Sequence, residues 1–346
     1  MILHSRPTLD QSDYSAVLQV LKSGHLVQGG KVGEFENVFS SMLGVEGAAA
    51  VSSGTSALHL ALLGLDVQKG DEIILPSFVC SAPLNAILYT GAVPVVADID
   101  RHSFNIEVDD LKHRISTKTK AIILPHMFGL PADVDSIISF GIPVIEDCAH
   151  TLGSRFNGAY TGSFGNLAIF SFYATKMIAT GEGGMVTSDN KYFIKIIKNL
   201  RDYDEKELYK IRYNYKMTDI QAALGISQLT KLHTFIGKRT EIADRYNSEF
   251  RDCNFEKPLT IPGRDHVFFR YVILHEHADQ FIDRMTKAGV ACRKPVFKPL
   301  HRYISLSGYA NTEWVWKRAV SIPIYPSLSD EEISRIVELV KRFHHV

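Results

Sequence analysis

The chain has 346 residues, of which 45% are hydrophobic and 22% charged, a balance typical of a globular protein with a substantial core. Basic and acidic residues number 38 each, so no excess of positive charge predicts binding to nucleic acid or to an anionic membrane surface. The four cysteines lack the close spacing of a zinc site, and no uncharged apolar run reaches the roughly 18 residues of a membrane span. We therefore expect a cytoplasmic protein with reduced thiols, no metal site and no amino-terminal signal segment.

Short apolar runs rich in β-formers alternate with helical patterns over about residues 44–190. The runs are Ala48–Val51, Glu72–Leu75, Val93–Ala97, Ala121–Leu124, Pro143–Ile145 and Ala168–Phe172. This alternation predicts an α/β fold with a mostly parallel central sheet and helices on both faces. Ligands bind at the carboxyl ends of the strands in such sheets, where Ser52, Pro76, His126, Asp147 and Ser171 all fall. We expect a single site at this edge.

The second part of the chain predicts a smaller α/β domain. A long helical region covers about Asp219–Phe250 and is followed by a strand over Val267–Leu274, a helix over Glu276–Ala288 and an extended segment over Ala319–Ile324. We place the boundary so that residues 1–230 form a large domain and residues 231–346 a small one.

The last helix has a clear start signal. Ser329 and Glu332 have the spacing of a capping box, in which each side chain bonds the other residue's backbone N–H. The apolar stripe that follows consists of Ile333, Ile336, Val337 and Val340. These features predict an amphipathic helix with a structural role.

Asp147 closes one predicted strand, and Lys176 follows the next. Glu146-Asp147-Cys148-Ala149-His150 ends the first run, and Lys176 lies between Ser171 and the glycine cluster at residues 181–184. A lone lysine in a loop is usually solvated. With a strand-end carboxylate nearby, however, it suits pyridoxal phosphate, which needs a lysine for covalent attachment and an anion that keeps its ring nitrogen protonated. We assign Lys176 the attachment and proton transfer, and Asp147 the ring nitrogen.

These residues and four further motifs, all in order, resemble the DegT/DnrJ family of pyridoxal phosphate-dependent nucleotide-sugar aminotransferases. The motifs are SSGTSAL at 52–58, GDEIILPS at 70–77, GAVP at 91–94 and NYKMTDIQAA at 214–223. The resemblance implies the PLP-transferase fold of type I. It also implies transfer of an amino group from an amino acid, with glutamate as the expected donor, to a nucleotide-linked keto-sugar. The product would be an amino-deoxysugar for an O-antigen, a surface glycan or a glycosylated metabolite.

The segment Gly54, Thr55 and Ser56 is the candidate phosphate site. These small residues join a strand to a helix, and a helix N-terminus presents backbone N–H groups to an anion. Simple capping of the helix is the alternative interpretation of the segment alone. The resemblance adds Ser171 as a hydroxyl donor to the phosphate.

The resemblance also supplies three further cofactor positions. His150 corresponds to a residue near the phenolic oxygen of the cofactor, and Asn214 to an asparagine that reaches the phosphate from a neighbouring subunit, which implies a homodimer with shared active sites. Asn214 could instead cap the following helix, and Lys216 is a rival for the phosphate contact. Cys80 stands where the family usually places an aromatic residue over the ring, so either this thiol or another side chain covers the ring. Phe78 cannot replace it if the segment is extended.

Four residues are candidates for substrate contact, and each has a solvated or structural alternative. They are His126, Arg293, Lys298 and His301, at a strand end or in a proline-broken loop. A cyclitol (amino-inositol) aminotransferase is a second function that fits the same chemistry. A dehydratase of the same family is less favoured, because dehydratases that resemble this fold carry histidine in place of the lysine. Retention of lysine, aspartate and phosphate loop also disfavours a non-catalytic regulatory protein.

Overall fold

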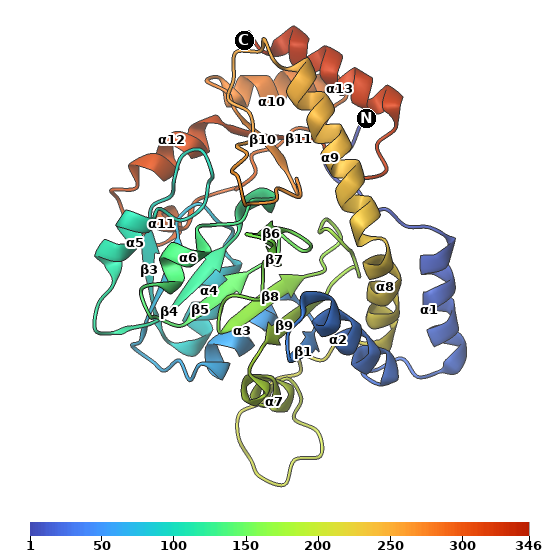
Figure 1. Cartoon of the computed structure of the whole chain (residues 1–346), viewed down its shortest axis with the longest axis vertical. Helices are drawn as coiled ribbons and strands as arrows, with labels where there is room; N and C mark the ends of the chain where they lie inside the picture. Colours follow the sequence, from blue (N-terminus) through green and yellow to red (C-terminus); the bar gives the residue numbers. More distant parts are fainter. Residues whose placement is uncertain (346) are drawn as a thin grey trace.

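The computed structural model describes residues 1–345 and has a seven-stranded central sheet of order β1-β9-β8-β5-β4-β2-β3 (Figure 1). Its strands are β1 (Gly47–Val51), β2 (Glu72–Pro76), β3 (Val93–Ala97), β4 (Thr119–Pro125), β5 (Val144–Asp147), β8 (Leu167–Ser171) and β9 (Gly184–Ser188). Strands β2, β3, β4, β5 and β8 pair in parallel, whereas β9 is antiparallel to β1 and β8. The predicted mostly parallel sheet is confirmed with all six predicted strands, to which the structure adds β9.

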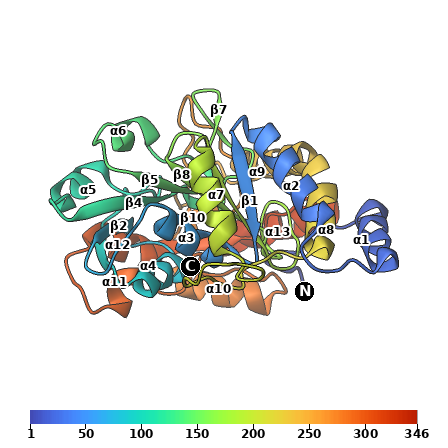
Figure 2. The ribbon, with the colours of Figure 1, turned by 90° about the horizontal axis from the view of Figure 1, so that it is seen from below.

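Six helices cover both faces of this sheet. They are α2 (Gly30–Leu43), α3 (Gly54–Gly64), α4 (Ala82–Thr90), α5 (Val108–Arg114), α6 (Val134–Ile138) and α7 (Lys191–Leu200). On β4, Ala121 and Ile123 pack toward α3, α4 and α7, whereas Ile122 and Leu124 pack toward α5 and α6. On the latter face, α2 covers β1, β8 and β9 through residues such as Phe35. Figure 2 shows α7 lying across the sheet close to β1. Both alternating sets of side chains are therefore buried, as expected for parallel strands.

The long helical region predicted from the sequence is present but interrupted. The helices concerned are α1 (Gln11–Ser23), α8 (Asp219–Thr230) and α9 (Leu232–Glu249). Lys231 separates α8 from α9, and its Nζ lies 2.7 Å from a carboxylate oxygen of Asp13, which joins the break to α1. At one end of α9, Leu232 belongs to the core under α2, and toward the other end Tyr246 belongs to a separate core. Helix α9 therefore links two hydrophobic cores (Figure 1).

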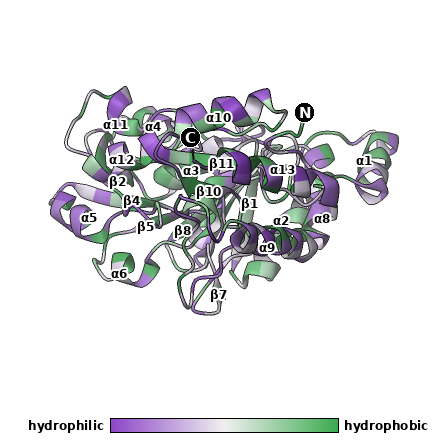
Figure 3. Ribbon diagram, turned by 90° about the horizontal axis from the view of Figure 1, so that it is seen from above, coloured by the Kyte–Doolittle hydropathy of each residue, from purple (hydrophilic) through white to green (hydrophobic). Residues whose placement is uncertain are grey.

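The second core surrounds a short antiparallel sheet. Its elements include β10 (Tyr271–Leu274), β11 (Ala319–Ile322), α10 (Ala278–Lys287) and α13 (Asp330–Phe343). The predicted capping box of α13 is confirmed: the Ser329 hydroxyl accepts from the Glu332 N–H, and the Glu332 carboxylate accepts from the Ser329 N–H. Hydrophilic and hydrophobic residues alternate around α10 and α13 (Figure 3), and the predicted stripe of α13 is buried.

The predicted strand Val267–Leu274 is shorter than expected, because its first half bonds elsewhere. The N–H of Val267 donates to the Gly129 carbonyl at 3.0 Å, and the N–H of Arg270 donates to the Phe128 carbonyl at 3.1 Å. Both acceptors follow β4, so residues 267–270 are held beside the carboxyl end of the large sheet. Of the predicted strand, only the part that forms β10 pairs with β11.

Smaller elements complete the described chain. They are η1 (Met127–Gly129), the hairpin β6 (Arg155–Phe156) and β7 (Ala159–Tyr160), α11 (Leu300–Tyr303) and α12 (Ala310–Arg318). Leu300 of α11 and Val315 of α12 belong to the core that contains α3 and α4, so the C-terminal part contacts the large sheet directly. Among the described helices, none has both the length and the apolar character that a membrane crossing requires.

A buried ion pair completes the edge strand β1. The Ala50 N–H donates to Glu36 Oε1 at 3.0 Å, and Arg201 Nη1 donates to the Ala50 carbonyl at 2.7 Å and to the Glu36 carboxylate. Glu36 and Arg201 are 5% and 6% exposed. The two side chains thus satisfy backbone groups that an edge strand otherwise leaves unpaired.

We expect Glu36→Gln to lower the free energy of unfolding by about 3 kcal/mol, because it leaves the Arg201 charge buried without its partner. The matched control on the same helix is Glu34→Gln, whose exposed pair with Lys31 is worth at most about 1 kcal/mol. Urea denaturation followed by circular dichroism measures both variants. Equal destabilisation by the two substitutions would contradict the structural role of Glu36.

Candidate active site

The segment from Ser52 to Ser56 joins β1 to the N-terminus of α3, as the sequence predicts. The Ser53 hydroxyl caps the helix by accepting from the Ser56 N–H at 3.1 Å. A Cβ added to Gly54 would lie 2.9 Å from the Ser171 Cβ, so the loop and the end of β8 are in direct contact. Backbone N–H groups at the start of α3 and the Ser171 hydroxyl therefore lie side by side, which is an arrangement suited to a phosphate.

The glycine cluster after Lys176 supports this loop. Gly184 opens β9 and pairs with Val51 on one side and with Ser171 on the other. A Cβ at Gly184 would lie 2.4 Å from the Ser53 carbonyl oxygen, which is closer than real Cβ contacts allow. Gly183 has a φ of 156°, which also favours glycine. The cluster is thus needed for β9 to pass this close to the phosphate loop.

Asp147 is the last residue of β5 and is 8% exposed. One carboxylate oxygen accepts from the Ala149 N–H at 3.1 Å, and within residues 1–345 no donor contacts the other oxygen. Burial raises the pKa of Asp147 above its ordinary value, and the positive charge of Lys176 opposes this rise. A buried carboxylate with an unused oxygen can accept a hydrogen bond from a ligand, and it would be costly to leave unpaired.

Lys176 lies in the turn between β8 and β9. Its Nζ lies 5.0 Å from the centroid of the Phe269 ring, and no carboxylate within the described chain forms an ion pair with it. Burial lowers the pKa of Lys176 to about 8, against the opposing effects of Cys80 and Asp147. The structure therefore gathers Lys176, Asp147 and Cys80 into one electrostatic neighbourhood, in which the amine is neutral far more often at neutral pH than that of an exposed lysine.

Two aromatic rings hold His150 in this neighbourhood. The imidazole stacks on Phe269 with centroids 4.3 Å apart and on Phe128 at 6.0 Å. Burial lowers the pKa of His150 well below its ordinary value, and the charges of Lys176 and Arg270 act in the same direction. The ring is therefore neutral at neutral pH and can accept or donate a hydrogen bond.

Cys80 and Phe78 have different surroundings. Phe78 is fully buried against the rings of Phe104 and Phe128, each with centroids 6.2 Å from its own, so its ring has no surface open to a ligand. The Cys80 side chain is exposed to solvent, and partial desolvation by the surrounding protein atoms raises the pKa of its thiol. Phe78 therefore does not take the place of the missing aromatic residue.

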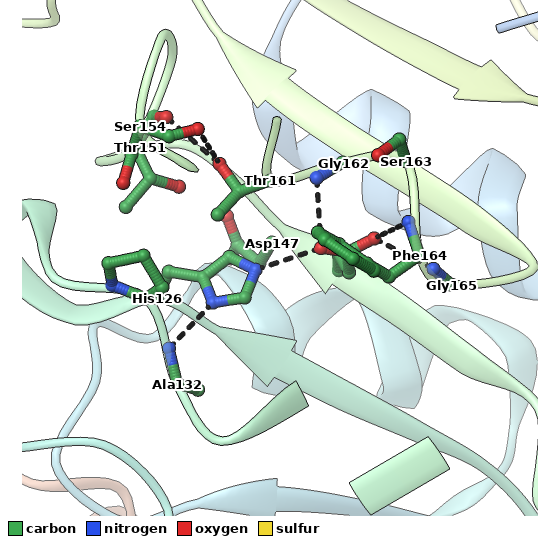
Figure 4. A network of polar contacts seen from close by, with 12 residues as sticks. His126, Ala132, Asp147, Thr151, Ser154, Thr161, Gly162, Ser163, Phe164 and Gly165 are labelled. Atoms are coloured by element: carbon green, nitrogen blue, oxygen red, sulfur yellow. Dashed lines mark hydrogen bonds and ion pairs between the residues drawn. The ribbon is translucent and has the colours of Figure 1, made fainter. Parts of the chain in front are cut away.

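Two of the four predicted substrate residues have structural partners. His126 is fully buried: its Nδ1 accepts from the Ala132 N–H at 3.0 Å, so its Nε2–H donates to Glu146 at 3.1 Å (Figure 4). The Glu146 carboxylate also accepts from the N–H groups of Gly162, Phe164 and Gly165. The expectation that His126 faces a substrate therefore needs correction, because both of its ring nitrogens are occupied.

His301 needs the same correction. It is 3% exposed, its Nδ1 lies 2.5 Å from the Ser77 hydroxyl, and its Nε2 lies 2.8 Å from a Glu313 carboxylate oxygen. These contacts connect the end of β2 to α12 and leave no free nitrogen. Arg293 and Lys298, by contrast, do line a cleft of about 460 Å³ together with Cys80.

Sequence reasoning missed His4, Phe269 and Arg270, which also belong to these surroundings. His4 and Arg270 line the same cleft, and the Phe269 ring is near both Lys176, at 5.0 Å, and Arg270, at 4.8 Å. A charged residue within the apolar run Val267–Leu274 is a signal that could have drawn attention to Arg270, because arginine is rarely buried without a partner. No motif marks His4.

Asn214 is exposed and belongs to a segment that completes the edge of β1. The Ser52 N–H donates to the Tyr215 carbonyl at 2.8 Å, and Val51 forms a β-bridge with Lys216. No hydrogen bond joins the Asn214 side chain to the phosphate loop within the described residues of one subunit. The rival Lys216 is already paired, at 2.9 Å with Asp202 and at 2.6 Å with Asp204.

These features fit pyridoxal phosphate. The unused oxygen of Asp147 suits a protonated ring nitrogen, the N-terminus of α3 with Ser171 suits a phosphate, and the unpaired amine of Lys176 suits an aldehyde. The residues come from β1, β5 and β8, whose carboxyl ends meet at one edge of the sheet.

Comparison with known proteins agrees with this interpretation. The DegT/DnrJ/EryC1/StrS aminotransferase family model matches residues 7–341. GDP-perosamine synthase from Escherichia coli O157:H7 is 35% identical, over 98% of this chain and 97% of that protein. Two solved structures share 28% identity and cover 99% of this chain and 98% of their own. They are the aminotransferase TlmJ from Streptoalloteichus hindustanus, with a TM-score of 0.95, and the PLP form of a putative sugar aminotransferase from Streptococcus pneumoniae, with a TM-score of 0.93. The chain belongs to the DegT/DnrJ/EryC1/StrS family and is a pyridoxal phosphate-dependent aminotransferase.

Proposed function

We propose that this aminotransferase moves an amino group from an amino acid, with L-glutamate as the leading donor, to the keto carbon of a nucleotide-linked sugar. The product would be an amino-deoxysugar for an O-antigen, a surface glycan or a glycosylated metabolite. The proposal depends on Lys176, whose pKa is lowered, and on the buried carboxylate of Asp147, which has one oxygen without a hydrogen bond. The chain that carries them matches GDP-perosamine synthase over nearly its full length. The 35% identity to GDP-perosamine synthase supports a nucleotide-linked acceptor.

We assign the following roles to the chain's own residues. Lys176 attaches the cofactor and, once released, takes up and returns a proton at Nζ, for which a pKa of about 8 suits neutral pH. The Asp147 carboxylate would accept a hydrogen bond from the N–H of the ring nitrogen. When bound, pyridoxal phosphate supplies an electron sink for the negative charge that develops on the substrate carbon. His150 would contact the phenolic oxygen, and Cys80 would lie beside the ring.

The phosphate is held by two sets of groups in this proposal. The first is the N-terminus of α3, with Gly54, Thr55, Ser56 and the Ser171 hydroxyl. The second is Asn214 of the neighbouring subunit in a homodimer with shared active sites. The exposed position of Asn214 supports a role outside its own subunit.

Two broader parts of the proposal concern organisation. We take residues 1–230 as the cofactor-binding domain and 231–346 as the small domain, a division supported by the two hydrophobic cores that α9 links. A cytoplasmic location is in keeping with four cysteines that are all free thiols.

The proposed function predicts amine transfer from glutamate to at least one sugar in a panel of TDP-, UDP- and GDP-linked keto-sugars, with the product detected by mass spectrometry. Lys176→Ala should abolish the visible absorbance of the lysine-linked cofactor. Loss of its proton transfer alone should slow turnover by roughly 10²–10⁴-fold. The control Lys191→Ala removes an exposed lysine paired with Glu46 and should leave both properties unchanged. A Lys176→Ala protein with normal turnover would exclude the assignment.

The lowered pKa of Lys176 predicts an unusual pH dependence in cofactor-free protein. Only the neutral amine reacts with acetic anhydride, so the acetylation rate of Lys176 should rise with pH and level off above about 8. Lys191, whose pKa is raised by Glu46, is the internal control and should keep rising at higher pH. Because the Asp147 charge raises the pKa of Lys176, Asp147→Asn should move the midpoint for Lys176 downward. Pulse labelling with mass spectrometry measures all three; coinciding profiles for Lys176 and Lys191 would refute the pKa shift.

The shared site predicts complementation between two impaired variants. If Asn214 acts across the interface, a heterodimer of Lys176→Ala and Asn214→Ala subunits has one site with both changes and one intact site. The heterodimer, co-expressed with two different tags and purified on both, should recover about half of the wild-type activity per dimer. If Asn214 serves its own subunit, no intact site forms and activity stays at the level of the impaired variants.

A further inference from the structure

The charged residues that line the cleft beside Cys80 are all basic. The volume of the cleft is about 460 Å³, and its lining includes Arg270, Arg293, Lys298 and His4. None of the described residues that line it is aspartate or glutamate. A cleft with several cations and no lining carboxylate attracts an anion, because the positive charges otherwise repel one another.

Among these cations, Arg270 has a side-chain partner, and that partner is uncharged. One guanidinium nitrogen lies 3.0 Å from His4 Nδ1. Because arginine can only donate, Nδ1 accepts, and the proton of the imidazole is on Nε2, which donates to the Ser321 hydroxyl at 2.9 Å. Burial lowers the pKa of His4 to about 3, so the ring stays neutral. Neither Arg270 nor Arg293 forms an ion pair with a carboxylate within residues 1–345.

The backbone and ring contacts of Arg270 make its position well defined. Its N–H donates to the Phe128 carbonyl, and the buried Arg239 donates to the carbonyls of Phe268 and Phe269 just before it. Its guanidinium lies 4.8 Å from the centroid of the Phe269 ring. A group fixed in advance in this way loses little conformational entropy when a ligand binds.

The same ring fixes the relation of Arg270 to Lys176. Lys176 Nζ lies 5.0 Å from the Phe269 centroid, and the Arg270 guanidinium lies 4.8 Å from the same point. The two cations are therefore neighbours across one ring-sized region. Arg270 also contributes to the lowered pKa of Lys176, as expected for cations that are near neighbours. An anion at Arg270 therefore lies in the neighbourhood of Lys176, which would hold the cofactor carbon that the substrate nitrogen attacks.

We propose that Arg270, oriented by the neutral imidazole of His4 and assisted by Arg293, binds the carboxylate of the amino-acid donor. This inference rests on the proposed aminotransferase function and specifies how one of its two substrates is recognised. In an α-amino acid, the carboxylate and the amine are attached to the same carbon, so an anion site close to Lys176 suits it. The diphosphate of a sugar nucleotide is attached through the sugar ring, farther from a keto carbon that accepts the amine.

Binding of glutarate, a dicarboxylate without an amine, tests the site without turnover. Calorimetric titration of the cofactor-loaded enzyme should show binding that Arg270→Met weakens roughly tenfold or more, as expected for loss of a charge-assisted hydrogen bond. His4→Phe keeps a ring but removes the acceptor, and it should weaken binding by a smaller factor. The control Arg245→Met removes an arginine of α9 that contacts Ser334 and should change nothing. Equally tight glutarate binding by Arg270→Met and wild type would overturn the proposal.

The two half-reactions identify which substrate carries the anion. With glutamate alone, Arg270→Met should raise the glutamate concentration that gives half the maximal rate roughly tenfold or more, with a smaller change in the limiting rate constant, both read from the loss of cofactor absorbance. The half-reaction with the keto-sugar should be nearly unaffected. An Arg270→Met variant that slows the keto-sugar half-reaction and spares the glutamate half-reaction would assign the site to the sugar nucleotide. The same assignment would follow if inorganic phosphate, and not glutarate, competed with the substrate at this site. Either result would overturn the donor assignment.

If wild-type enzyme bound no pyridoxal phosphate and did not react with glutamate, the proposed function itself would fail. Normal wild-type reactivity with an unaffected Arg270→Met variant would remove only this inference.

Discussion

The close approach of three backbone segments is the constraint on which the active site depends. The N-terminus of α3 at Gly54, the end of β8 at Ser171 and the start of β9 at Gly184 all lie in contact. A Cβ at either glycine would meet atoms at 2.9 Å or less, so one of the segments would have to move. Any such movement would separate the helix N–H groups from the Ser171 hydroxyl and would displace the turn that carries Lys176. The glycine cluster therefore sets the position of both the phosphate site and the lysine.

Burial of opposite charges then gives the site its chemistry. Desolvation raises the pKa of Asp147 and lowers that of Lys176, and each charge partly reverses the shift of the other. The result is an amine that can change protonation state near neutral pH beside a carboxylate with an unused acceptor oxygen. Two neutral histidines lie in this field: His4 accepts a hydrogen bond from Arg270, and His150 lies near Lys176, so neither adds charge.

The features that the sequence predicted correctly are those carried by local signals. Strand ends, the capped helix start and the capping box of α13 depend on residues close together in the chain. The errors at His126 and His301 have a different origin, because one of the two partners of each ring is distant in the chain: Glu146 is 20 residues from His126, and Ser77 is 224 residues from His301. A histidine after a strand has the same local pattern whether its nitrogens are free or occupied.

The contrast between two buried arginines shows what the structure adds to such patterns. Arg239 is 3% exposed and donates to three backbone carbonyls, so its charge stabilises the segment before Arg270 and is not directed at the cleft. Arg270 has a side-chain acceptor that carries no charge, and it faces a cleft to which residues 1–345 contribute no carboxylate. The His4 that provides this acceptor is 266 residues away and is held there because residue 2 pairs with Val290. The proposed anion site therefore requires that the N-terminal segment, the small sheet and the carboxyl edge of the large sheet are assembled together, and for this reason substrate recognition cannot be assigned to one of these parts alone.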